Sequence, residues 1–130
     1  MACVAGVLLV AILQAVPAHA SDPDTEATAG REIAALIEAV GESGCRFQRN
    51  GRWHPPAAAQ AHLQRKLETA RRRGLHGGAE DFIARIASRS SLTGRAYRVR
   101  CGDGPEQPAS DWFDLQLQRL READSSRSPR

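Results

Sequence analysis

The sequence predicts an α+β fold in which about four helices pack on a small three-stranded antiparallel sheet, with one disulfide. Apolar residues repeat with helical spacing within residues 33–40. Asn50-Gly51 lies between two short alternating segments, which is a strong signal for a β-hairpin. Tyr97, Val99 and Cys101 alternate with arginines and predict a third strand with one buried face. Because helical segments separate the strands, we expect the helices to cover one side of the sheet.

The first predicted helix has one apolar face. Its members follow the i, i+3, i+4, i+7 spacing and are Ile33, Leu36, Ile37 and Val40. Gly41 and Gly44 are expected to end the helix. The polar residues 21–28 are expected to form a leader that precedes a single compact domain at 29–123.

The hairpin at 45–53 has two possible registers. A two-residue turn at Asn50-Gly51 would place Trp53 on the face opposite Phe47. A three-residue loop with a bulge at Gly51 would instead pair Phe47 with Trp53, so that both rings reach the core. We expect the bulged form.

Two further helices are predicted between the hairpin and the third strand. Pro55 and Pro56 suit the first turn of a helix, which ends in three arginines followed by Gly74. A shorter helix begins after Gly77-Gly78, with acidic residues in its first turn and Phe82 facing inward. Residues 88–94 are expected to form a polar turn before the third strand.

A last helix follows the loop expected at 102–108. Ser110 can cap it, and its apolar face contains Phe113, Leu117 and Leu120. Residues 124–130 are too polar to pack against a core, so they are expected to be a disordered tail.

The N-terminal residues 1–20 are interpreted as a signal peptide. They carry no charged side chain, and their apolar stretch at 4–13 is too short to span a bilayer as a helix. Ala18-His19-Ala20 fits the small-x-small rule, which predicts cleavage after Ala20 and an exported protein with no transmembrane anchor. Cleavage removes Cys3, so Cys45 and Cys101 are left to form a disulfide in an oxidising compartment.

The formal net charge of +3 is unevenly distributed. Residues 46–100 carry thirteen Lys or Arg and three acids, whereas residues 21–45 carry six acids and one Arg. A basic segment of this kind can attract an anionic partner, or it can be neutralised by the acidic first helix. Arg65 and Lys66 can form one basic ridge with the arginines at 71–73, because residues six or seven apart return to nearly the same helix face, or these cations are simply solvated.

We therefore expect a non-catalytic periplasmic module that binds an anionic or glycan partner of the envelope, or another periplasmic protein. The polar turn offers an arginine and hydroxyls, which suit a carboxylate, a phosphate or a sugar. The candidate binding residues are Arg65, Lys66, Arg89, Ser90, Ser91 and Tyr97. The bland alternative is that the serines only bond the neighbouring backbone.

Two other functions stay open. A hydrolase of envelope components would need Ser90 or Ser91 within hydrogen-bond reach of a histidine, such as His54 or His62. A structural or inhibitory protein would use an apolar patch around Trp112. No catalytic, cofactor or metal motif is recognised, and export argues against a nucleic-acid partner. The sequence leaves the oligomeric state open.

Several short segments are similar to a known family. They are SGCRF at 43–47, RNG at 49–51, AHL at 61–63, Arg65-Lys66, AEDFI at 79–83, SRSSLTG at 88–94, Tyr97, Cys101 and SDW at 110–112. In this order they resemble the small exported bacterial proteins of domain of unknown function 5329, the YfeK-like family. The resemblance implies a periplasmic address but no reaction, and it carries over no functional residue.

Overall fold

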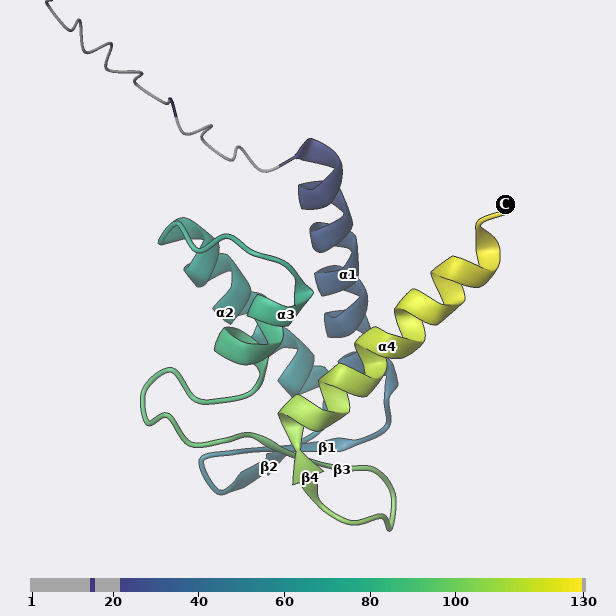
Figure 1. The fold of residues 1–130 in the computed structure, drawn as a ribbon. Helices are drawn as coiled ribbons and strands as arrows, with labels where there is room; N and C mark the ends of the chain where they lie inside the picture. The colour runs from purple at the N-terminus through teal and green to yellow at the C-terminus, as the bar shows by residue number, and fades with distance from the viewer. Residues whose placement is uncertain (1–14, 16–21, 130) are drawn as a thin grey trace, which may run out of the picture.

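The computed structural model describes residue 15 and residues 22–129, and over this range the chain is an α+β domain. In chain order the elements are α1 (Pro23–Glu42), β1 (Arg46–Arg49), β2 (Arg52–His54), α2 (Pro56–Arg72), α3 (Ala79–Phe82), the π-helical turn η1 (Ile83–Ala87), β3 (Arg98–Arg100), β4 (Gln107–Pro108) and α4 (Ala109–Arg127). The helices lie on one side of the sheet (Figure 1). The predicted signal peptide at 1–20 lies outside the described residues apart from Ala15, so it stays a prediction.

The sheet has four strands in this range rather than the three expected, in the order β2-β1-β3-β4. Gln107 and Pro108, expected in a loop, pair antiparallel with Val99 and Arg98. A proline lacks the backbone N–H that an inner strand needs, but it fits an edge strand such as β4. The strand was missed because two residues are too few to show alternation.

Helix α1 begins earlier than the sequence analysis predicted. The Asp22 carboxylate accepts a hydrogen bond from the Asp24 amide, and Pro23 occupies the first turn. Both features stabilise a helix start, because the first amides have no partner within the helix. The segment expected as a polar leader therefore contributes the exposed first turns of α1.

The hairpin uses the two-residue turn, so the preferred bulged register is wrong. Arg49 pairs with Arg52 and Gln48 pairs with Trp53. Asn50 and Gly51 have φ angles of 50° and 80°, which are the left-handed conformations of the tightest hairpin turns. Trp53 thus lies on the face opposite Phe47, where the Arg100 guanidinium covers its ring at 5.7 Å.

The core lies between the sheet and the helices. The ring of Phe47 packs edge to face against the ring of Trp112 of α4, with the ring centroids 5.5 Å apart. Trp112 thus occupies the place beside Phe47 where Trp53 was expected. The predicted face of α1 is buried, as are Val99 of β3 and Phe82 of α3. The predicted disulfide between Cys45 and Cys101 is confirmed, and it ties the start of β1 to the end of β3.

Helix α4 continues to Arg127, so residues 124–127 are helical rather than part of a disordered tail. The Ser125 and Ser126 hydroxyls donate to the carbonyls of Arg121 and Glu122 one turn earlier. These bonds satisfy the two hydroxyls on the exposed end of the helix but do not themselves stabilise its last turns. Among the described residues, no helix is both long enough and apolar enough to cross a bilayer.

Candidate functional site

Lys66 is the centre of the predicted site, and it is tied into the fold. Its half-buried ammonium donates to the carbonyls of Ile86 and Arg89, at 2.7 and 2.8 Å, and to the Tyr97 hydroxyl at 3.1 Å. Helix ends leave carbonyls without partners, and the ammonium satisfies them where η1 ends. The structure therefore brings Lys66, Arg89 and Tyr97 together, but Lys66 and Tyr97 act as structural supports there.

The segment 88–97, which we call the polar loop, is held by its own hydrogen bonds. The Ser90 amide donates to the Arg95 carbonyl, and the Gly94 amide donates to the Ser90 carbonyl. The Ser90 hydroxyl oxygen accepts from the amides of Leu92 and Thr93, both at 3.3 Å. Ser90 is 5% exposed, so this serine shapes the loop and does not face a partner.

The polar loop is also joined to the turn of the β1–β2 hairpin. The Thr93 hydroxyl donates to the Asn50 side-chain oxygen at 2.8 Å. In Figure 1 the hairpin turn and the loop between η1 and β3 project from the same end of the molecule. Asn50 was missed as a site residue because its partner is 43 positions away and no local pattern reports such a contact.

The serines and histidines do not form the pair that a hydrolase needs. The Ser90 oxygen is occupied by backbone amides, and Ser91 is exposed with no hydrogen bond to another described residue. The His62 ring nitrogen lies 3.3 Å from the Tyr97 hydroxyl instead of a serine. Within the described part of the chain, no three His, Cys, Asp or Glu side chains gather where they could hold a metal ion.

Positive charge is concentrated around the hairpin turn and α2. Burial, followed by the charge of Arg49, lowers the pKa of Lys66 to about 8. The hydrogen bonds to three oxygens favour the protonated amine, so Lys66 is charged at pH 7. Burial also lowers the pKa of His54, and the charges of Arg49 and Arg52 lower it further.

Arg49 is a site residue that sequence reasoning missed, although it lies on the same face of β1 as Phe47. It also lines a hollow of about 30 Å³ between β1 and α2. We define the basic surface as the cations of the hairpin turn, the middle of α2 and the polar loop. They are Arg49, Arg52, Arg65, Lys66, Arg89 and Arg95.

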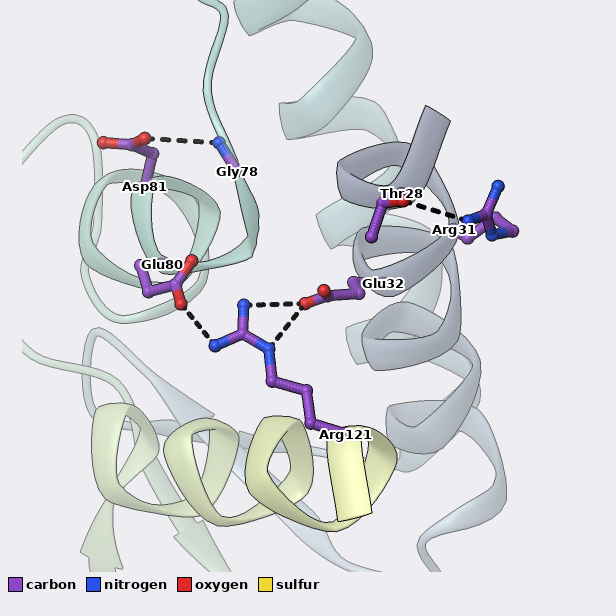
Figure 2. Close-up of polar contacts among 7 residues, drawn as sticks. All are labelled: Thr28, Arg31, Glu32, Gly78, Glu80, Asp81 and Arg121. Atoms are coloured by element: carbon purple, nitrogen blue, oxygen red, sulfur yellow. Dashed lines mark hydrogen bonds and ion pairs between the residues drawn. The ribbon is translucent and has the colours of Figure 1, made fainter. Parts of the chain in front are cut away.

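Among the described residues, the acidic helix α1 forms no ion pair with the basic surface. Glu32 of α1 binds Arg121 of α4, which also pairs with Glu80 at 2.6 Å (Figure 2). Within residues 22–129, none of the cations of the basic surface takes part in an ion pair. Segments 43–67 and 82–102, which supply these cations, contain no Asp or Glu.

Other arginines lie apart from the basic surface. Arg98 and Arg100 alternate with the buried Val99, so they project from the uncovered face of the sheet, where both pair with Glu106. Arg71 lines a separate cleft of about 410 Å³ beside α1. Arg71 thus faces a different region from the basic surface.

Comparison with known proteins shows the family of this chain. The model of DUF5329, a family of unknown function, matches residues 27–121. The chain belongs to the DUF5329 family. The uncharacterized protein YfeK of Salmonella typhimurium (strain LT2) is 37% identical to it over 90 residues, which are 68% of this chain and 71% of that protein. No solved structure matches it.

The DUF5329 match includes the whole basic surface, the polar loop and the disulfide. The resemblance seen in the short motifs is thereby confirmed at the level of the family. Because the family is described as having no known function, membership assigns no role to any of these residues. The function of this DUF5329 protein has to be inferred from its own geometry.

His62 predicts a pH dependence of stability. Burial, then the charges of Arg49 and Lys66, lower its pKa from 6.5 to about 4. The unfolded chain therefore binds a proton at higher pH than the folded chain, so stability falls as the pH drops from about 6.5 to about 4. Because the ring is half-exposed, we expect a loss of roughly 1 kcal/mol.

Urea unfolding at several pH values measures this loss. His62→Gln keeps a hydrogen-bonding group near Tyr97 but cannot titrate. The free energy of unfolding of this variant should therefore fall less steeply as the pH drops. The exposed His76 provides the control variant, His76→Gln, which should keep the slope of the unmodified protein. An unchanged slope in His62→Gln would show that other groups cause the acid sensitivity.

Proposed function

We propose that this protein is a non-catalytic periplasmic module that binds an anionic partner of the bacterial envelope through the basic surface. The observation that carries the proposal is the set of cations from three elements that share one region without an acidic partner. Such a region has a positive potential that steers and holds an anion. The predicted signal peptide and the disulfide support the periplasmic address.

The shape of the surface favours an extended anion over a small enclosed ligand. The hollow beside Arg49 has a volume of about 30 Å³, enough for about one water molecule. A sugar ring or a nucleotide needs a pocket roughly ten times larger. A polymer or a surface with repeated negative charges can instead meet several cations at once without entering a pocket.

Neither alternative function gains support from the geometry. The serine-histidine pair of the hydrolase hypothesis is not joined by a hydrogen bond, since Ser90 and His62 are engaged elsewhere. Trp112 is only 5% exposed and packs against Phe47 and Phe113, so it offers no apolar docking patch.

The proposal predicts binding that depends on salt and on the position of the cations. Labelled inorganic polyphosphate is a suitable soluble probe, with binding followed by fluorescence anisotropy. Binding should weaken strongly between about 50 and about 500 mM salt, because salt screens exposed charges. The triple variant Arg49→Gln, Arg65→Gln, Arg89→Gln should bind at least about tenfold more weakly at low salt, since each cation contributes about 1 kcal/mol near an anionic surface.

A matched triple variant separates position from net charge. Arg71→Gln, Arg72→Gln, Arg73→Gln removes the same number of cations, all of them exposed, from the far end of α2. We expect this control to stay within about threefold of the unmodified protein. Equal losses in the two triple variants, or no salt-sensitive binding at all, would contradict the proposal.

A further inference from the structure

Leu92 is an apolar side chain held out in solvent at the tip of the polar loop. It is 96% exposed, whereas Leu115, the other large exposed apolar residue among those described, is 42% exposed. The amides of Leu92 and Thr93 both donate to the Ser90 hydroxyl oxygen, and Thr93 is bonded to Asn50. Leu92 therefore lies in a loop whose backbone is held in place by hydrogen bonds on both sides of it.

Cations flank this leucine in the polar loop and in the neighbouring hairpin turn. Arg89 and Arg95 lie within the polar loop, and both are exposed. The contact between Thr93 and Asn50 places the loop beside the hairpin turn, which adds Arg49 and Arg52. The end of the molecule that carries the two turns thus combines one projecting apolar residue with several unpaired cations.

We propose that this end docks on the surface of an anionic phospholipid bilayer, with Leu92 entering the boundary of the acyl chains and the basic surface meeting the lipid phosphates. The inference rests on the proposed function and names its partner. Peripheral membrane proteins combine these two elements, an apolar group that is buried in the interface and cations that are attracted to acidic headgroups.

The exposed leucine favours a membrane over a soluble polyanion. A soluble polyanion can neutralise the arginines, but it has no apolar phase to receive Leu92. A bilayer offers both phases within the few ångströms that separate phosphates from acyl chains. An acidic protein with an apolar pocket would also accommodate both groups, and the experiment distinguishes it.

Vesicle co-sedimentation tests the proposal, using protein exported to the periplasm of an expression host. Vesicles of phosphatidylcholine with about 30% phosphatidylglycerol should bind the protein, and vesicles of phosphatidylcholine alone should not. Leu92→Ser should lower the partition coefficient about tenfold, because it removes the buried apolar side chain. Leu115→Ser, on α4, is the matched control and should change partitioning less than about twofold.

The outcomes separate this inference from the proposed function. If polyphosphate binds but vesicles do not, or if Leu92→Ser partitions like the unmodified protein, the membrane inference is wrong and the anion-binding proposal stands. If neither probe binds, both are wrong. If Leu92→Ser keeps vesicle binding but loses capture of an acidic periplasmic protein, the docking partner is that protein. Leu92→Ser should bind polyphosphate normally, which shows that the variant is folded.

Discussion

Removing the disulfide with Cys45→Ala and Cys101→Ala is expected to lower the free energy of unfolding by about 4 kcal/mol. The two cysteines are 56 positions apart, and the bond restricts the unfolded chain by closing this long loop. Cys45 is 4% exposed, so alanine is chosen to avoid burying a hydroxyl without a partner. The loss would be a large share of the 5 to 15 kcal/mol that holds a typical domain together.

Urea unfolding of the oxidised protein and the double variant measures this effect. The dependence on urea should also steepen in the variant, because an unfolded chain without the cross-link exposes more surface. Adding a reductant should shift the unmodified protein toward the variant and leave the variant unchanged. A midpoint that hardly moves would mean that the bond adds little to the packing around Cys45.

Replacing Lys66 with methionine is expected to cost about 2 to 4 kcal/mol. Methionine has a similar length but no donor, so the carbonyls of Ile86 and Arg89 and the Tyr97 hydroxyl lose a shared charged partner. Leaving part-buried acceptors unsatisfied is costly, particularly when the lost donor carried a charge. We expect the loss to be concentrated where η1 meets the polar loop.

The control for this variant is the neighbouring residue on the same helix. Arg65→Met also removes one cation from α2, but the Arg65 side chain is exposed and makes no hydrogen bond to a described residue, so stability should change by less than about 0.5 kcal/mol. Hydrogen exchange of the Ser90 and Tyr97 amides should accelerate in Lys66→Met alone. Equal stability of the two variants would show that Lys66 is not a structural tie. This expected loss is also why Lys66 is left unchanged in the binding variants.

Local patterns in the sequence predicted the helical faces and the hairpin, because these signals depend on residues close together in the chain. The four apolar positions of α1 are buried as predicted, and Asn50-Gly51 forms the turn. The predicted register of that turn is wrong, because it was chosen to pair Phe47 with Trp53 and bury both rings in the core. In the fold, Trp112 fills the place beside Phe47, and Trp53 is covered by Arg100.

The candidate site was likewise predicted in part. Sequence reasoning found Arg65, Lys66 and Arg89, since they lie in segments that are rich in polar or cationic residues. Sequence reasoning did not distinguish Lys66, whose ammonium binds oxygens within the fold, from the arginines that form no ion pair in the described part of the chain. That difference depends on hydrogen bonds across 20 or more positions, which no local spacing encodes.

The sequence by itself determined the α+β class, the pairing of Cys45 with Cys101 and the basic character of the middle segment. These properties follow from composition and from periodicity within single elements. Only the tertiary structure decided that Glu32 of α1 pairs with Arg121, that Asn50 joins the hairpin to the polar loop, and that Leu92 is exposed beside cations. The physical reason is that ion pairing and exposure depend on which distant segments come into contact, and these contacts are decided by tertiary packing.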